Sequence, residues 1–152
     1  MPYATADARS QILEVLGASA DDLALGLAQL GEAYELVDEA MADRLEVELF
    51  RPLKLAYGRA RRAHTSFAER HELPAREFAP APEAAPARGA KGLIEDASLS
   101  VVEGEQKLAG LQDSMLPVEV GDAELRADLE QVRTLLSGFI GHTRELLRTL
   151  GR

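Results

Sequence analysis

The fold is decided by residues 20–72, which read ADDLALGLAQLGEAYELVDEAMADRLEVELFRPLKLAYGRARRAHTSFAERHE. Apolar residues return every three or four positions, the spacing that places them on one side of an α-helix. The first half of the stripe alternates steps of four and three, through Leu23, Leu27, Leu30, Tyr34, Val37 and Met41. The second half advances mostly in fours, through Leu45, Leu49, Leu53, Ala56, Ala60, Ala63 and Phe67. The sequence therefore predicts one long helix over residues 20–72, with a stutter where the spacing changes.

Pro52 lies inside this long predicted helix. Proline has no N–H for the carbonyl four residues earlier, and it disfavours helical geometry for the residue before it. No Gly or Asn of the kind that forms turns stands next to it. We therefore expect a kinked helix at Pro52 rather than a hairpin, and we expect the helix to end at Leu73-Pro74.

The same periodicity predicts helices on both sides of the long one. A short helix is expected at residues 6–16, ending at Gly17. Two more are expected at residues 92–114 and 122–150. Because the loop between these two is short, they should form an antiparallel hairpin. Gly104 falls on the apolar stripe of the first of them, where it would let another helix approach closely.

Residues 74–91 connect the long helix to the hairpin. They are rich in alanine and contain Pro74, Pro80, Pro82 and Pro86. This composition favours an extended connection with little apolar surface to bury. Since such a long connection is uncommon in a compact domain, it is either mobile or runs along the bundle. We expect the 152 residues to form a single helical domain. Its fold class is all-α, an elongated helical bundle with one long Pro-kinked helix, a C-terminal antiparallel helix hairpin and a short N-terminal helix.

The patterns that carry catalysis or hold metals in small helical proteins are absent from the sequence. There is no cysteine, which excludes thiolate metal sites and a cysteine nucleophile. Carboxylate di-iron bundles need Glu-x-x-His on two helices, but none of His64, His71 and His142 has a glutamate three residues before it. Nucleotide-binding glycine patterns and the Gly-x-Ser-x-Gly of hydrolases do not occur. We therefore expect a protein that is not an enzyme, with no catalytic or metal-binding residue and no cofactor.

Charge is unevenly distributed in a chain whose formal net charge is −9. Residues 1–50 carry eleven acidic and two basic side chains, whereas residues 51–72 carry six basic and two acidic ones. At about 100° per residue, the apolar stripe of this basic segment lies on one side of the helix, and most basic residues lie on the other. The candidate partner-binding residues on this basic face are Arg51, Lys54, Arg59, Arg61 and Arg62. Such a face can bind an acidic protein surface or anionic lipid, or serve only as solvated surface.

These features favour a structural, adaptor or regulatory protein that works through protein–protein contacts. Two copies crossing antiparallel would set the acidic first half of the long helix against its basic second half, so we expect an antiparallel homodimer. The alternative is a protein that binds a membrane surface through the basic face. A third possibility is an enzyme or a ligand-binding bundle with a pocket lined by groups such as Tyr57, His64 or His142.

Nucleic acid and a membrane-spanning role are disfavoured by composition. The acidic net charge and the absence of tryptophan argue against a nucleic-acid-binding surface. No apolar stretch is long enough for a transmembrane helix, and the first residues lack the features of a secretory signal. We therefore expect a cytoplasmic protein without a transmembrane segment.

Overall fold

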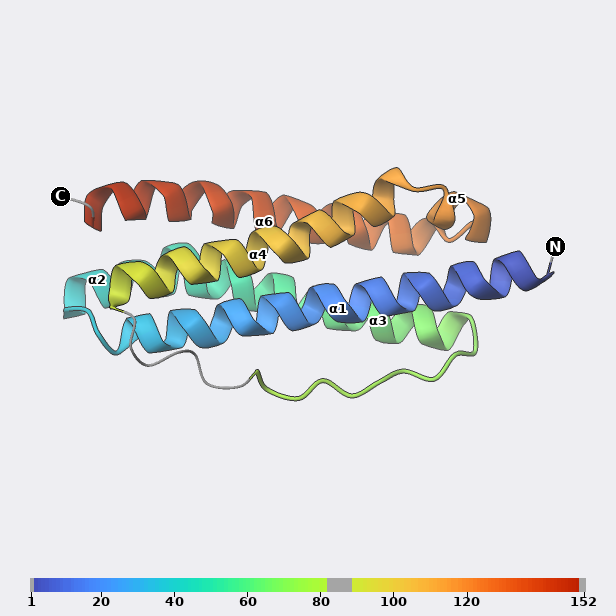
Figure 1. Cartoon of the computed structure of the whole chain (residues 1–152), viewed down its shortest axis with the longest axis horizontal. Coiled ribbons are helices and arrows are strands. Elements are labelled where there is room, and N and C mark those ends of the chain that lie inside the picture. The colour runs from blue at the N-terminus through green and yellow to red at the C-terminus, as the bar shows by residue number, and fades with distance from the viewer. Residues whose placement is uncertain (1, 82–88, 151–152) are drawn as a thin grey trace.

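A computed structural model describes residues 2–81 and 89–150, and every regular element within these ranges is a helix. In chain order the elements are α1 (Pro2–Tyr34), α2 (Glu39–Arg44), the π-helix η1 (Leu45–Phe50), α3 (Arg51–Arg70), α4 (Ala90–Asp113), α5 (Leu116–Val120) and α6 (Ala123–Leu150). The predicted all-α class is confirmed, and so is the C-terminal helix pair, which α4 and α6 form (Figure 1).

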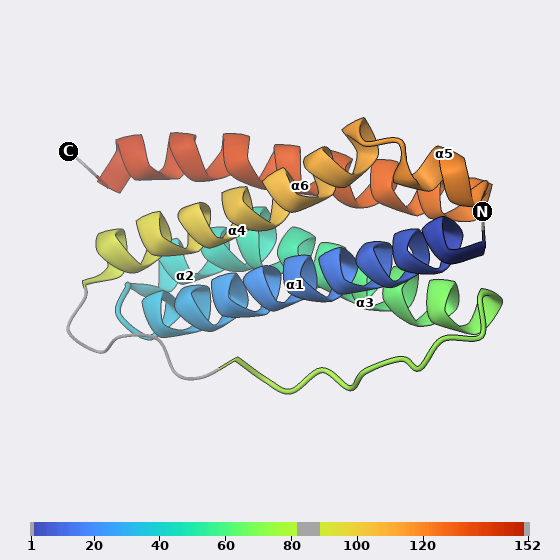
Figure 2. The ribbon, with the colours of Figure 1, turned by 45° about the vertical axis from the view of Figure 1, so that its right-hand side comes forward.

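The long helices lie side by side as an elongated bundle (Figure 1; Figure 2). α1 is antiparallel to the continuous run of α2, η1 and α3, hereafter the α2–α3 run, and α4 is antiparallel to α6. α1 packs most extensively on α4, and α3 packs on both α1 and α6. Because the α2–α3 run and α4 begin at the same end of the bundle (Figure 1), the chain between them crosses the bundle's length. The architecture is therefore two helix hairpins joined by one long crossover.

The predicted helix boundaries at residues 6–16 and 20–72 are wrong. α1 passes through Gly17 without a break, because Gly17 is buried in the bundle and a glycine inside a helix costs only about 1 kcal/mol relative to alanine. The chain reverses instead at residues 35–38. There the Asp38 carboxylate accepts a hydrogen bond of 2.8 Å from the Met41 N–H and caps α2, as aspartate commonly does at a helix N-terminus.

The stutter in the apolar stripe coincides with the π-helix η1. A π-helix has a wider turn than an α-helix, so the buried side chains of Leu45, Leu49 and Leu53 stay on one side although they are spaced in fours. η1 ends just before Pro52, and the Arg51 N–H donates to the carbonyl of Glu46, five residues earlier. The helix thus continues through Pro52, as predicted, and η1 is the irregularity that precedes it.

Pro52 has no N–H to donate to a carbonyl of the preceding turn. The Nδ1 atom of His142, on α6, lies 3.3 Å from the Glu48 carbonyl oxygen in that turn, so the ring donates a hydrogen bond there when its proton is on Nδ1. We expect His142→Ala to lower the free energy of unfolding by about 0.5–1.5 kcal/mol. In a Pro52→Ala background, where the backbone N–H is restored, the same change should cost almost nothing. Urea unfolding measures both losses, and equal losses would contradict this account.

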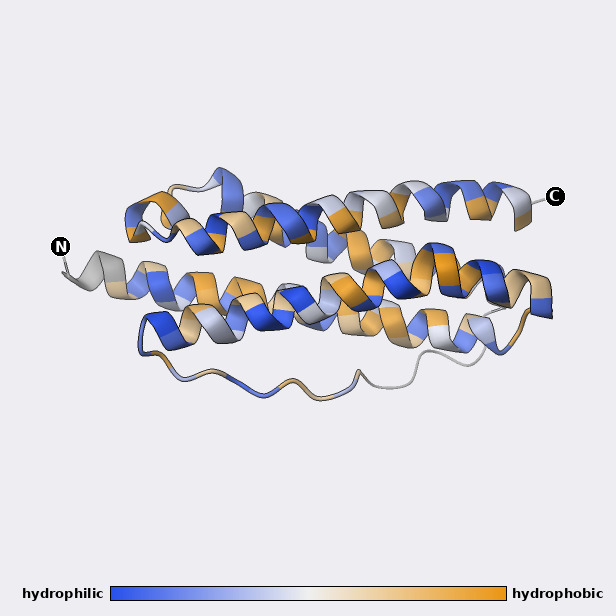
Figure 3. Ribbon diagram, turned by 180° about the vertical axis from the view of Figure 1, so that it is seen from behind, coloured by the Kyte–Doolittle hydropathy of each residue, from blue (hydrophilic) through white to orange (hydrophobic). Residues whose placement is uncertain are grey.

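The core is one continuous apolar cluster along the bundle, to which α1, η1, α3, α4 and α6 all contribute. Hydrophilic and hydrophobic residues alternate along each long helix, as expected for helices that bury one side (Figure 3). Thr143 interrupts the apolar stripe of α6 yet is buried, because its Oγ1 donates to the Phe139 carbonyl at 2.8 Å.

α1 and α4 pack closely against each other at Gly104, as predicted. A Cβ atom on Gly104 would lie 3.1 Å from the Leu23 Cδ2 atom and 3.3 Å from the Ser19 carbonyl oxygen. The Ser19 hydroxyl also donates a 2.9 Å hydrogen bond to the Gly104 carbonyl. The absence of a side chain at this position therefore allows both the close packing and the hydrogen bond.

The predicted connection over residues 74–91 buries more than its composition indicated. In its described part, Phe78 packs against the core, as does Leu73 just before it. This part lies alongside the first hairpin in both views (Figure 1; Figure 2), which agrees with the expectation that the connection runs along the bundle. Residues 82–88 lie outside the described residues.

Candidate functional site

Most of the predicted basic face lies on the outside of α3. Arg51, Lys54, Arg61 and Arg62 are exposed. Arg59 is half-buried and donates a hydrogen bond to the Gln131 side chain of α6. Four of the five predicted residues therefore share an open surface, and the fifth belongs to the contact between α3 and α6.

Exposed apolar and acidic residues extend this surface along the whole α2–α3 run. Val47 and Leu55 are 56% and 48% exposed, although side chains of this kind are usually buried. Glu39 and Asp43 are exposed near the start of the run. We call this surface the outer face; it consists of Glu39, Asp43, Val47, Arg51, Lys54, Leu55, Arg61 and Arg62. It is acidic at one end, basic at the other and partly apolar between.

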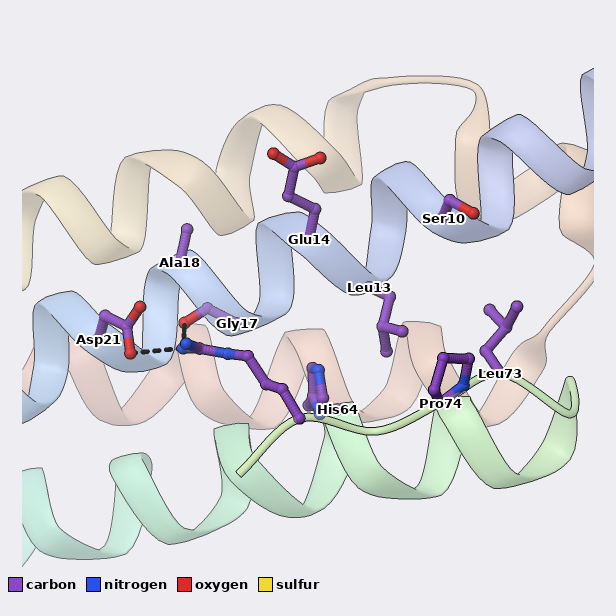
Figure 4. Close-up of a pocket in the computed structure, with 10 residues that line it drawn as sticks. Ser10, Leu13, Glu14, Gly17, Ala18, Asp21, His64, Leu73 and Pro74 are labelled. Carbon is purple, nitrogen blue, oxygen red and sulfur yellow. Dashed lines mark hydrogen bonds and ion pairs between the residues drawn. The ribbon is translucent and has the colours of Figure 1, made fainter. Parts of the chain in front are cut away.

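A groove of about 420 Å³ lies between α1, α3 and the extended residues 73–76. Its apolar walls are Leu13 of α1 with Leu73 and Pro74 of the extended segment, and its polar groups include His64, Asp21 and Arg76. Leu13 points from α1 toward the extended segment, while His64 points from α3 toward α1 (Figure 4). The groove therefore has apolar walls, with Asp21 and Arg76 at one polar end, Ser10 at the other end and Glu14 between them (Figure 4).

Arg76 fastens the extended segment to α1 at this polar end. Its Nη2 atom donates to the Gly17 carbonyl at 2.9 Å and to the Asp21 carboxylate. The guanidinium also lies 4.3 Å from the centre of the Phe78 ring, a cation–π contact. A Cβ atom on Gly17 would lie 2.9 Å from the Arg76 Nε atom. Glycine at position 17 therefore provides the room in which Arg76 lies against the helix.

His64 is the buried polar residue of the groove. Only 2% of it is exposed, and its ring meets the Phe78 ring edge-on, with centroids 5.0 Å apart. Its Nδ1 atom has no hydrogen-bond partner within the part of the chain that the structure describes. Burial, and secondarily the positive charge of Arg76, lower the pKa of His64. The imidazole is therefore held in its neutral form beside a guanidinium.

The three groups named for a pocket from the sequence lie in separate places. Tyr57 stacks under the Arg61 guanidinium at 5.4 Å and His142 contacts Glu48, so only His64 lines the groove. Sequence reasoning missed Arg76 and its contacts because the segment reads as linker. The signal that could have found it is the presence of the large side chains of Leu73, Arg76 and Phe78 within six residues, which is unusual in a flexible linker.

A second cluster of polar side chains surrounds Asp122, before the start of α6. The carboxylate accepts two 3.0 Å hydrogen bonds from Arg70 and one of 2.7 Å from His71 Nε2. It also accepts a 2.9 Å hydrogen bond from the Leu125 N–H and thereby caps α6. The His–Asp pair has the geometry of a catalytic dyad, but the other contacts of Asp122 are those of a helix cap tied to α3. We assign it a structural role.

The described residues offer neither a metal site nor a membrane-spanning helix. Two hairpins with one crossover are the arrangement in which carboxylate bundles carry di-iron centres. In residues 2–81 and 89–150, however, no three His, Asp or Glu side chains are grouped so that they could hold a metal ion. Nor does any helix in those ranges have the length and apolarity needed to cross a membrane. Compared with known proteins, the chain matches no protein family, no curated protein and no solved structure.

Proposed function

We propose that the protein is a non-enzymatic structural, adaptor or regulatory module that self-associates as an antiparallel dimer through the outer face. The observation that carries this proposal is the order of exposed residues along the α2–α3 run. Acidic Glu39 and Asp43 come first, and basic Arg61 and Arg62 come last. A surface of this kind is complementary to itself when a second copy lies on it in the opposite direction.

A register centred on Arg51 satisfies both the charges and the apolar side chains. It sets Val47 of one copy opposite Leu55 of the other, twice by symmetry, and it places Glu39 next to Arg62. The two copies of Arg51 meet near the axis, where each is paired with its own Glu46 at 3.4 Å. Exposed ion pairs contribute only about 0.2–1 kcal/mol each. The apolar contact therefore supplies affinity, while the charges select direction and register.

Anionic lipid is a weaker candidate for the same surface. The basic end with exposed Leu55 resembles a membrane-binding helix face, but Glu39 and Asp43 on the same face would be repelled by anionic headgroups. Cosedimentation with phosphatidylserine vesicles distinguishes the two partners. Salt-sensitive binding to these vesicles by a monomeric protein would favour lipid over self-association.

Charge reversal tests the dimer. We expect Arg61→Glu/Arg62→Glu to weaken dimerisation about tenfold or more, because attractive pairs become repulsive. Glu39→Lys/Asp43→Lys should weaken it similarly, and the quadruple variant should restore it. Light scattering on the size-exclusion peak, over a range of protein concentration, gives the mass. The matched control is Arg144→Glu/Arg148→Glu, which changes net charge equally on the exposed side of α6 and should have no effect. A wild-type monomer at all concentrations, or failure of the quadruple variant to recover, would contradict the proposal.

A further inference from the structure

We propose that the groove between α1, α3 and the extended residues 73–76 binds a small, largely apolar carboxylic acid. The carboxylate would lie between His64 and Arg76, and the hydrocarbon part would contact Leu13, Leu73 and Pro74. This site is separate from the outer face and does not depend on self-association. Its volume of about 420 Å³ is within the range of small-molecule sites, which are commonly apolar with a few polar groups that fix orientation.

The first argument is the unpartnered nitrogen of His64. Buried polar side-chain atoms nearly always have a hydrogen-bond partner. Only 2% of the His64 surface is exposed, yet among the described residues its Nδ1 atom has no hydrogen-bond partner. The residue lines the groove and points into the space between α3 and α1 (Figure 4). The missing partner is therefore expected to be a molecule that occupies the groove.

The second argument is the sign of charge near the imidazole. The charged side chains around it are Glu14 and Asp21 of α1, Arg76 of the extended segment, and Arg61 of α3, which lies over the same Phe78 ring. Burial is the first cause that lowers the pKa of His64, and the positive charge of Arg76 is the second. The guanidinium and the imidazole both lie against the Phe78 ring. A carboxylate between them would therefore pair with Arg76, and its arrival would favour protonation of the ring.

The third argument selects a monocarboxylate over a phosphate. Arg76 already donates to the Gly17 carbonyl and to Asp21, so its charge is partly used, and Glu14 adds negative charge to the lining. A phosphate dianion would need more positive charge than one shared guanidinium provides. A single carboxylate matches the one guanidinium and one imidazole, and Leu13, Leu73 and Pro74 offer apolar contact to the rest of the molecule.

Octanoate and 1-octanol test this proposal, because they share a hydrocarbon chain and differ in the charged head. We expect calorimetry at pH 7 to show octanoate binding at least tenfold tighter than 1-octanol. In NMR titrations of the histidine rings, saturating octanoate should raise the pKa of His64. Equal binding of the two compounds, no binding of octanoate, or an unchanged pKa of His64 would each overturn the proposal.

Single substitutions locate the site. Arg76→Gln and His64→Gln should each weaken octanoate binding about tenfold, whereas Arg144→Gln, which removes an exposed charge on α6 away from the groove, should leave it unchanged. Because Arg76 also fastens the extended segment, circular dichroism must first show that each variant keeps its helical content. If a variant does not fold, the comparison of octanoate with 1-octanol on the unmodified protein still decides the question. Equal affinity in the three folded variants would place the ligand elsewhere and overturn the assignment.

Discussion

Asp122→Ala is expected to lower the free energy of unfolding by about 3 kcal/mol. The Asp122 side chain is only 6% exposed, and its carboxylate joins two parts of the fold. It receives hydrogen bonds from Arg70 and His71 at the end of the first hairpin, and it caps α6 in the second through the Leu125 N–H. Alanine would leave the Arg70 guanidinium partly buried without this partner and would leave α6 uncapped. Urea unfolding at pH 7 measures the loss.

Glu124→Ala is the matched control for this variant. Glu124 also pairs with Arg70, at 3.0 Å, but its side chain is 60% exposed. An exposed pair contributes at most about 1 kcal/mol, so we expect a loss well below that of Asp122→Ala. Similar losses in the two variants would show that the Arg70 charge, rather than burial and capping by Asp122, determines the effect.

The same cluster predicts how stability depends on pH. Burial alone would raise the pKa of Asp122, but the Leu125 N–H, the His71 ring and the Arg70 guanidinium together hold it below its usual value. A carboxyl with a lowered pKa in the folded state stabilises the fold fully above the pKa it has when unfolded, and this contribution is lost as pH falls through the folded-state pKa. The stability difference between wild type and Asp122→Ala should therefore be constant from about pH 5 to 7 and shrink below about pH 4.

Gly104→Leu is expected to destabilise the bundle by about 3 kcal/mol, at the upper end of overpacking effects. Even a Cβ atom would meet Leu23 at 3.1 Å and the Ser19 backbone oxygen at 3.3 Å. A leucine would have to separate α1 from α4 and break the Ser19–Gly104 hydrogen bond. Thermal unfolding followed by circular dichroism measures the change.

Gly110→Leu, on the same helix, is the control for the Gly104 variant. Gly110 is exposed, and no described atom outside its local helix lies within 4 Å of the Cβ that would be added. Leucine is a better helix former than glycine by roughly 0.5–1 kcal/mol, so this variant should be as stable as the wild type or more stable. A comparable loss at both positions would show that the cost is not one of helix separation.

The sequence predicted the elements whose evidence is local, because the α-helical period acts over a few residues. The apolar stripes of α4 and α6, the close approach at Gly104 and the irregularity before Pro52 could all be found this way. The reversal at residues 35–38 could not, since the stripe of α1 continues into α2 in step and only the Asp38 cap marks the turn. Gly17 was predicted to end a helix because glycine is a common helix terminator. The helix continues there because Gly17 is buried against other parts of the bundle, and such tertiary packing cannot be read from local sequence.

The basic face and the groove also differ in how far they could be predicted from the sequence. Four residues of the basic face could be predicted because exposure on a helix follows from its own apolar stripe. The groove depends on Arg76 and His64, which are twelve residues apart in sequence and meet only because the chain doubles back over α3 and contacts α1. No pattern in a single sequence encodes such a return, although the large side chains Leu73, Arg76 and Phe78 mark the segment as more than a spacer.

The packing of α1 on α4 also determines when the bundle can finish folding during synthesis. The most extensive interface of α1 is with a helix far along the chain; Ser19 and Gly104, which join the two, are 85 residues apart. During synthesis the first hairpin emerges with one side of α1 still facing water, and that side is covered only after Asp113 has left the ribosome. Bringing residues so far apart in sequence together costs conformational entropy before the contacts between them can stabilise the fold. The first hairpin is therefore expected to be less stable alone than within the whole chain, and the apolar surface on α1 stays uncovered until α4 has been made.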